Sequence, residues 1–395
     1  MQDLRKYKAV QRFYVEPWMI QRIQSINYDL IELMHFQLLR NSGLDTHFRA
    51  SRQDTHNLKS NRKGLGNILD TPFSMLTMTI SDAADWECLL TKDTLSRKME
   101  EIQNQLPRLE FVDRQLIDAG NRRFLDLVTS LINMNVLAAP MLGITAELAK
   151  VLVSVSPYQL GKAMERLSGI PLFGFRFANP RFWLEFTSNH LSEETIAHQL
   201  MLTAAPLGKV PYPKVWHEDF RLSKNLVESY SDAMMAYGCR ASTTASLFRL
   251  APNYTRGRFT TIHNKPSACG NQPNSLSWFI DSPAKRLHSS VYSWLYRSAL
   301  AGNANVPEAL IAANDLYHSI FGRGAVITPD RACLLTRSMS ADNRLTIVPC
   351  KNCDTEYIAS NSDTKIEMHS SFQCPGCRLQ LVGRSGKHSK SGFSR

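Results

Sequence analysis

The feature that most constrains this chain is a pair of Cys-x-x-Cys motifs near its C-terminal end. Cys350 and Cys353 form the first pair, and Cys374 and Cys377 form the second pair after 20 intervening residues. Two such turns brought together by a hairpin place four thiolates at tetrahedral corners, the geometry that Zn²⁺ adopts in structural sites. We therefore predict one structural zinc ion per chain, because four cysteine ligands leave no coordination position open for catalysis. The alternative is a thioredoxin-like redox pair, for which one motif would suffice and a βαβ pattern should be present.

The residues around the motifs predict a small zinc-ribbon-like β lobe at residues 342–382. Residues 345–348, 357–359 and 379–382 have the composition of short strands, and the polar residues at 360–363 predict the turn of the hairpin between the two motifs. A lobe of this size has too thin a core to fold alone, so bound metal would supply much of its stability. Residues 383–395 are expected to form a disordered basic tail.

The charge of the chain is concentrated in two places. There are 46 Lys and Arg residues against 35 Asp and Glu residues, a formal net charge of +11. Residues 233–280 and 378–395 contain no acidic residue and together contribute +10 of that charge. Acid-free basic segments are typical of proteins that bind a polyanion, and we expect nucleic acid before membrane. The alternative is a solvated basic loop followed by a disordered tail.

The first basic segment has the plan of a helix-turn-helix motif. Residues 242–250 and residues 252 to about 263 are predicted helices separated by a short break, with Pro252 at the first position of the second helix. In such motifs the N-terminal residues of the second helix reach the base edges. An ordinary basic helical hairpin is the alternative, because the turn lacks glycine and Gly257 within the second helix costs about 1 kcal/mol. The predicted DNA-binding residues are Arg240, Arg249, Asn253, Tyr254, Thr255, Arg256, Arg258 and Lys265.

The sequence also argues against membrane insertion and catalysis. It contains no uninterrupted apolar run of about 18 residues, and its first 14 residues are charged where a signal peptide would be apolar. We expect a cytoplasmic protein without a membrane partner. No H-E-x-x-H, Walker, G-x-S-x-G or G-x-G-x-x-G motif is present, so we predict that the protein is not an enzyme.

From about residue 222 to residue 380 the chain resembles FlhC, the C subunit of the bacterial flagellar master transcriptional activator. The resemblance is carried by the helix-turn-helix region, the Pro-Ser-Ala-Cys-Gly-Asn-Gln-Pro linker at 266–273, Leu-Ser-Trp-Phe at 276–279, Asn-Asp-Leu-Tyr at 314–317 and the paired cysteine motifs. It implies that the four motif cysteines bind zinc, that the chain binds double-stranded promoter DNA, and that it acts with RNA polymerase. The implied targets are flagellar operons or the transfer genes of mobile elements.

Residues 116–205 resemble FlhD, the partner D subunit. Residues 156–159 form a predicted capping box with proline at the first helical position, and Leu-Phe-Gly-Phe-Arg-Phe at 172–177 matches the aromatic-Phe-Arg-Phe signature of that subunit. Residues 193–203 predict a final helix. The chain therefore looks like a natural fusion of D and C subunits joined by a proline-containing linker at 206–221, and the resemblance implies a homo-oligomer formed through the D-like half.

Residues 1–115 are predicted to be helical and partly disordered, with no assigned role. One amphipathic helix contains Ile26, Leu30 and Leu38, a polar run at 41–63 is expected to be mobile, and a second helix is expected near 93–105. Because D chains outnumber C chains in the resembled family, we hypothesise that this segment is a degenerate second D-like copy.

The predicted protein is mainly α-helical. It comprises a helical D-like oligomerisation domain (116–205), a helical C-like domain containing the helix-turn-helix (222–341) and the small zinc lobe (342–382). Its predicted function is that of a DNA-binding transcriptional activator that recruits RNA polymerase. A zinc-ribbon RNA-binding protein is the alternative, and RNA should then compete better than specific duplex DNA.

Overall fold

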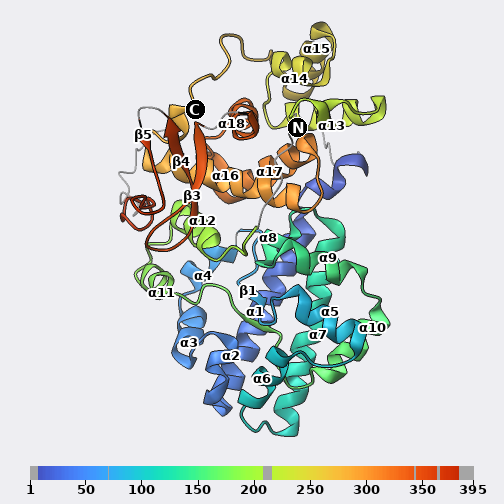
Figure 1. The fold of residues 1–395 in the computed structure, drawn as a ribbon, viewed down its shortest axis with the longest axis vertical. Coiled ribbons are helices and arrows are strands. Elements are labelled where there is room, and N and C mark those ends of the chain that lie inside the picture. The colour runs from blue at the N-terminus through green and yellow to red at the C-terminus, as the bar shows by residue number, and fades with distance from the viewer. Residues whose placement is uncertain (1–7, 70, 208–215, 342–343, 363–364, 382–395) are drawn as a thin grey trace, which may run out of the picture.

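The computed structural model describes residues 8–69, 71–207, 216–341, 344–362 and 365–381. In these residues the chain is mainly helical, as predicted, with two small antiparallel sheets, β1-β2 and β3-β4-β5 (Figure 1). Half of the predicted linker at 206–221, residues 208–215, and the whole basic tail at 383–395 lie outside the described residues.

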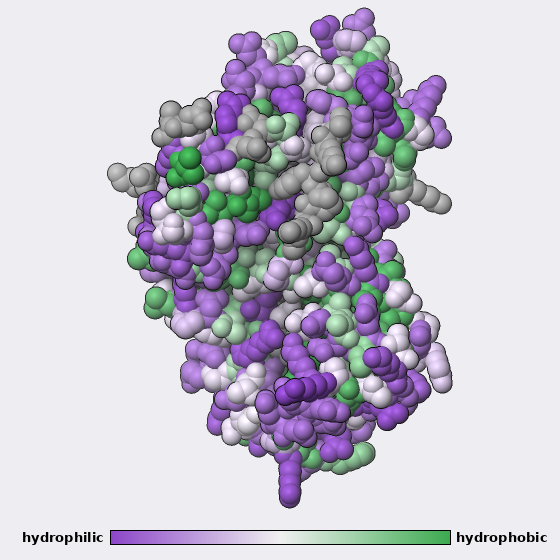
Figure 2. Space-filling view, viewed as in Figure 1, coloured by the Kyte–Doolittle hydropathy of each residue, from purple (hydrophilic) through white to green (hydrophobic). Residues whose placement is uncertain are grey.

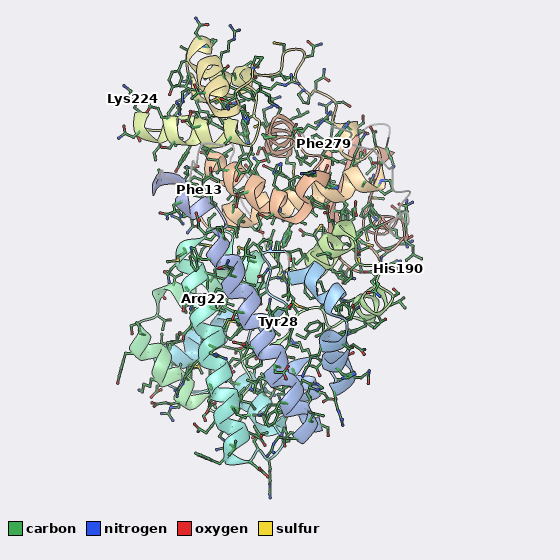
Figure 3. All side chains as sticks on the ribbon, turned by 180° about the vertical axis from the view of Figure 1, so that it is seen from behind. Phe13, Arg22, Tyr28, His190, Lys224 and Phe279 are labelled. Atoms are coloured by element: carbon green, nitrogen blue, oxygen red, sulfur yellow. The ribbon has the colours of Figure 1, made fainter. Side chains whose placement is uncertain are left out.

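Residues 8–202 form one helical body, most of which makes up the lower half of the molecule in Figure 1, while its two ends lie against the upper half. Its two long helices, α1 and α7, lie side by side (Figure 3). Strand β1 from the N-terminal segment pairs with β2 from residues 116–205, so the predicted boundary near residue 115 does not separate two bodies. The elements are η2 (Lys8–Phe13), α1 (Pro17–Arg40), η3 (Ser42–Leu44), α2 (Asp45–Phe48), α3 (Arg52–Ser60), α4 (Arg62–Leu69), β1 (Leu76–Met78), α5 (Ala83–Lys92), α6 (Arg97–Gln105), α7 (Phe111–Met134), α8 (Ala138–Leu142), α9 (Ala146–Ser154), α10 (Pro157–Arg166), β2 (Phe173–Phe175), α11 (Pro180–Thr187) and α12 (Glu193–Leu202).

The polar run at 41–63, which we expected to be mobile, instead forms short helices. Ser51 caps α3 and forms a capping box with Asp54, which satisfies two backbone donors at the start of that helix. Thr55 and Leu58 are buried, and α3 packs against α1. Leu44 and Phe48 in the same run have no exposed surface, so buried apolar side chains together with a good cap order a segment that is mostly polar.

The upper half of the molecule contains the helices of the C-like region. Helices α16 and α17 are capped by Ser282 and Asn305, and each has a proline in its first turn, as expected of residues that start a helix. The elements are η4 (Glu218–Phe220), α13 (Lys224–Ala236), α14 (Ala241–Phe248), α15 (Pro252–His263), η5 (Ser277–Phe279), α16 (Pro283–Ala301), α17 (Val306–Phe321), η6 (Gly322–Gly324) and α18 (Pro329–Ala341).

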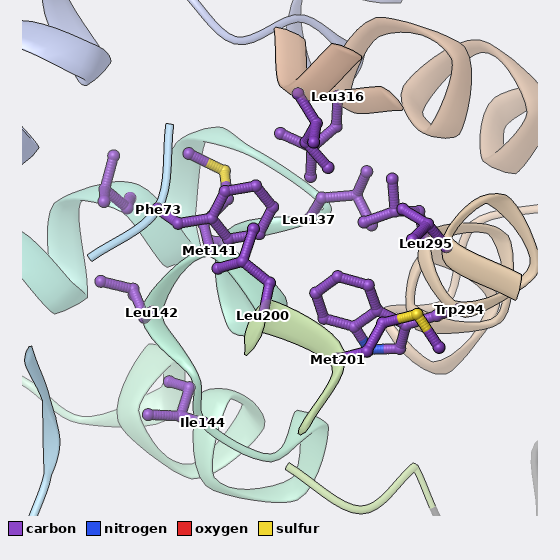
Figure 4. Close-up of a cluster of buried hydrophobic side chains, with 14 of the residues drawn as sticks. Phe73, Leu137, Met141, Leu142, Ile144, Leu200, Met201, Trp294, Leu295 and Leu316 are labelled. Atoms are coloured by element: carbon purple, nitrogen blue, oxygen red, sulfur yellow. The ribbon is translucent and has the colours of Figure 1, made fainter. Parts of the chain in front are cut away.

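One hydrophobic core continues through both halves. In Figure 4, Phe73 and Leu200 from the lower body lie beside Trp294, Leu295 and Leu316 from α16 and α17. The four aliphatic and phenyl side chains among these are fully buried or nearly so. Burial of this kind gives about 25 cal/mol for each Å² of apolar surface, so the two halves are joined by packing as well as by the linker.

The β lobe lies against α16. Strands β3 (Leu345–Pro349), β4 (Glu356–Ser362) and β5 (Lys365–Ile366) form an antiparallel sheet, with Ile347 opposite Ile358. The backbone N–H of Ile358 donates to Ser290 Oγ on α16 at 2.9 Å. The strand predicted at 379–382 is absent from the part of that segment that the structure describes, because Leu379 adopts a left-handed turn conformation with φ of 56°.

No helix in the described part of the chain has both the length and the apolar character needed to cross a bilayer. The face of the molecule in Figure 2 is mostly hydrophilic, with hydrophobic residues in small separate patches.

Candidate zinc centre and nucleic-acid interface

The four motif cysteines come together at one end of the β lobe. The sulfur atoms of Cys350, Cys353, Cys374 and Cys377 all lie within 4.8 Å of one another. Cys350 and Cys374 are buried, and Cys353 and Cys377 are partly exposed. The structure therefore brings together all four residues that the sequence predicted as metal ligands.

Backbone N–H groups point at the sulfur atoms. The N–H groups of Asn352 and Cys374 donate to Cys350 Sγ at 3.5 and 3.3 Å, and the N–H of Cys377 donates to Cys374 Sγ at 3.3 Å. Such donors orient the ligands of a metal site and stabilise negative charge on sulfur. This arrangement of four soft donors fits a tetrahedral structural zinc ion.

The four thiols cannot ionise independently at this spacing. A hydrogen bond from the Cys374 thiol lowers the pKa of Cys353, and the same bond raises the pKa of Cys374. Burial and the nearby Cys353 raise the pKa of Cys377. A divalent cation among the sulfur atoms would offset this mutual repulsion and allow the remaining thiols to lose their protons.

The second Cys-x-x-Cys turn is packed tightly against helices α11 and α12. A Cβ atom on Gly376 would lie 2.2 Å from Nε2 of His198, so only glycine fits at this position. Arg181 on α11 donates from Nη1 to the Gly376 carbonyl at 2.6 Å. Burial lowers the pKa of His198 to about 4, which keeps the ring neutral, and its Nδ1 lies 2.8 Å from the Tyr357 hydroxyl. Sequence analysis missed this contact, because no local pattern connects residues so far apart in the chain.

The basic segment forms the predicted helical hairpin. Helices α14 and α15 are joined by residues 249–251, and Arg249 takes the left-handed conformation (φ 55°) that a glycine would have adopted more easily. Phe259 and Ile262 on α15 pack against Met235 of α13 and Ala241 of α14. The hairpin lies at the end of the molecule farthest from α2 and α6 (Figure 1).

Five of the eight predicted DNA-binding residues are exposed on this hairpin or just after it: Arg249, Asn253, Tyr254, Arg256 and Lys265. Asn253 and Arg256 are one helical turn apart on α15, and the exposed Gly257 and Thr260 continue the same face. A Cβ atom on Gly257 would have no neighbour within 4 Å, so this face is open to a large ligand. DNA contact by these residues stays a prediction.

The other three residues stabilise the hairpin itself. Thr255 has no exposed surface, and its hydroxyl donates to the Pro252 carbonyl. Arg258 forms a bidentate ion pair with Asp232 of α13, whose side chain is only 2% exposed. Arg240 donates to the backbone carbonyls of Gly270 and Asn271 at 3.1 and 3.0 Å. These contacts turn Thr255 and Arg258 toward the protein, so the structure gives no support to their predicted role in binding bases.

The C-terminal part of the chain is similar to one protein family. The model of the FlhC family, described as a flagellar transcriptional activator, matches residues 231–392. The match covers the hairpin, the helices α16 to α18 and all four motif cysteines, and it agrees with the resemblance inferred from the sequence. No curated protein matched the chain.

Proposed function

We propose that this chain is a DNA-binding transcriptional activator of the flagellar master-regulator type that acts without an enzymatic step. The observation that carries the proposal is the exposed, acid-free face at the start of α15, within a region similar to FlhC. A short helix presented on a three-residue turn enters the major groove with its N-terminal residues toward the bases.

On this proposal Asn253 and Arg256 read base edges, while Arg249 and Lys265 contact phosphates on either side. Asparagine matches the adenine edge and arginine matches the guanine edge through paired hydrogen bonds. Tyr254 is half-exposed at the same end of the helix. Phosphate contacts make binding depend on salt, with a log–log slope of about −0.9 for each phosphate neutralised.

The zinc lobe and the basic residues that follow it supply a second DNA contact in this proposal. One zinc ion bound by the four motif cysteines stabilises the lobe, and the lobe fixes the point from which the tail leaves. Residues 116–205 act as a D-like half fused to the C-like half, and an exposed face of the assembly recruits RNA polymerase to flagellar or mobile-element transfer operons.

The experiment that tests the proposal is selection from a random duplex pool by the zinc-loaded full-length protein at physiological salt. The variant with Arg249→Ala and Arg256→Ala removes two exposed arginines of the hairpin. Arg258→Ala is unsuitable here, because loss of its ion pair with Asp232 would disturb the hairpin itself. We expect the wild-type protein to enrich a defined motif and the double variant to lose it.

Failure of the wild-type protein to enrich any sequence would contradict the proposal. Structured RNA that competes better than the enriched duplex would favour the zinc-ribbon RNA-binding alternative instead.

A further inference from the structure

The body formed by residues 8–202 contains the same series of elements twice. We call residues 17–105 unit 1 and residues 111–202 unit 2. Each α-helix and strand of unit 1 begins 93 to 97 positions before its counterpart in unit 2, and only the short η3 of unit 1 has no counterpart among the described elements. The long helices α1 and α7 both have 24 residues. The counterparts are α1 and α7, α2 and α8, α3 and α9, α4 and α10, β1 and β2, α5 and α11, and α6 and α12.

The helix starts of the two units match in chemistry as well as in position. Four helices in each unit begin at a residue whose side chain accepts a hydrogen bond from the first turn, as helix N-caps do. The matching caps are Ser51 and Thr145, Asn61 and Ser156, Asp82 and Asn179, and Ser96 and Ser192. Matching starts in four successive helices are not expected of two unrelated helical segments.

A buried asparagine makes the same bond in each unit. In unit 1, Asn27 Oδ1 accepts from the backbone N–H of Met75 at 3.1 Å. In unit 2, Asn121 Oδ1 accepts from the backbone N–H of Leu172 at 2.8 Å. Neither asparagine has exposed surface. Each joins the long helix of its unit to the residue directly before the strand of that unit. A buried polar group that recurs with its partner indicates a shared internal design.

The contacts between the two units are reciprocal. Across the strand pair, the N–H of Thr79 donates to the Leu172 carbonyl at 3.1 Å, and the N–H of Arg176 donates to the Met75 carbonyl at 2.8 Å. Thr79 is the equivalent of Arg176, and Met75 is the equivalent of Leu172. The two bonds are therefore the same contact made in both directions, as across a twofold axis. Equivalent residues also face each other directly at the centre of the strand pair, where Thr77 lies opposite Gly174.

A second point on the same axis lies between the long helices. Asp29 of α1 and Arg123 of α7 occupy equivalent positions in the two helices and form an ion pair at 3.2 Å. A residue contacts its own equivalent only where the axis passes, so the strand pair and the helix pair define one common axis.

We infer that units 1 and 2 are two copies of one fold that pair about an internal pseudo-twofold axis. The surface through which such a unit would bind a second subunit is therefore occupied by the other copy in the same chain. This inference does not depend on DNA binding. It supports the hypothesis of a second D-like copy, and it replaces the predicted homo-oligomer through residues 116–205 with pairing inside one chain.

The symmetry is broken where the C-like region binds. Helix α12 of unit 2 packs against α16 and α17, whereas its counterpart α6 is largely exposed. Counted from the caps Ser192 and Ser96, the buried apolar residues Ile196, Ala197, Leu200 and Met201 correspond to the exposed residues Glu100, Glu101, Asn104 and Gln105. Burying those polar side chains without partners would be unfavourable, so only unit 2 can hold a C-like region of this kind. Each chain thus combines two paired units with one C-like region.

The test uses the ion pair on the axis. Asp29 and Arg123 have side chains that are 40% and 61% exposed, so replacing them with cysteine should not disturb folding. The full-length zinc-loaded protein would carry Cys88→Ser and Cys269→Ser to remove the accessible native thiols outside the zinc site. Asp29→Cys and Arg123→Cys would be introduced singly and together, treated with a short bismaleimide, and analysed by denaturing electrophoresis and peptide mass spectrometry over a range of protein concentrations.

We expect the double variant to form a link within one chain at every concentration and the single variants to form none. If unit 2 paired with unit 2 of another chain, Arg123→Cys alone would give a covalent dimer, because that residue would face itself. Dimers from either single variant, a link between chains in the double variant, or no link in the double variant would each overturn the inference. None of these outcomes depends on whether the protein binds DNA.

Discussion

Two arginines two positions apart on α15, Arg256 and Arg258, should differ sharply in their effect on stability when each is replaced by alanine. Arg258 holds Asp232, a carboxylate whose side chain is 2% exposed, through Nε at 3.2 Å and through Nη2. Removing one partner of a buried ion pair costs about 3–5 kcal/mol, since the other charge stays buried. The Arg258 side chain is 28% exposed, so water can enter after truncation and we expect the lower end, about 3 kcal/mol. Arg256 is exposed, and its loss should change stability by less than about 0.5 kcal/mol.

Amide hydrogen exchange of peptides from α13 and α15 measures this effect locally, which matters in a chain that need not unfold in one step. A loss of 3 kcal/mol corresponds to exchange faster by roughly 100-fold in Arg258→Ala, with little change in Arg256→Ala. Adding Asp232→Asn to Arg258→Ala should recover part of the protection, because the buried charge is then gone. Equal exchange in the two single variants would refute the assignment of Arg258 to the interior. In DNA binding, Arg249→Ala should make the salt slope shallower by about 0.9, because the proposal assigns that side chain to a phosphate.

Three further predictions concern the zinc lobe and the helical core. Removing metal with a chelator, or replacing Cys374 with Ser, should remove one equivalent of bound zinc. Amide hydrogen exchange should then become faster in β3 and β4 but not in α1 or α7. Unchanged exchange in β3 and β4 would mean that the metal is not structural. Gly376→Ala should destabilise the lobe by about 1–3 kcal/mol through its clash with His198, whereas Gly257→Ala, which meets no neighbour, should stabilise α15 by up to about 1 kcal/mol, as thermal unfolding and exchange would reveal. Burial lowers the pKa of His288 to about 4, so the unfolded chain binds a proton more readily than the folded chain as pH falls below 6.5. This residue should account for a loss of about 2 kcal/mol of stability between pH 7 and pH 5, in addition to the loss from His198, whose pKa is lowered in the same way. Denaturant titrations at both pH values should show a smaller drop in His288→Gln.

Features that depend on residues close together in the sequence could be predicted from the sequence alone. Each Cys-x-x-Cys spacing predicts one tight turn with two sulfur atoms. Because a structural zinc site is built from two such turns, the cluster of Cys350, Cys353, Cys374 and Cys377 could be predicted. Ser156, Ser282 and Asn305 begin helices because each cap acts on the turn directly after it. For the same reason the helices and the turn of the basic hairpin were placed within one or two residues.

Features that depend on packing between distant segments were decided only by the tertiary structure. Arg256 and Arg258 look alike in the sequence, and it is the position of α13 beside α15 that turns Arg258 toward Asp232 and leaves Arg256 in solvent. Gly376 reads as an ordinary turn glycine until His198, from the other half of the chain, is found against it. The pairing of units 1 and 2 was only a hypothesis from the sequence, because most of their side chains differ while their helix caps, buried asparagines and strand register match. Turns, helix caps and ligand spacings depend on a few consecutive residues, whereas the residue that a side chain contacts across the core depends on how the whole chain packs.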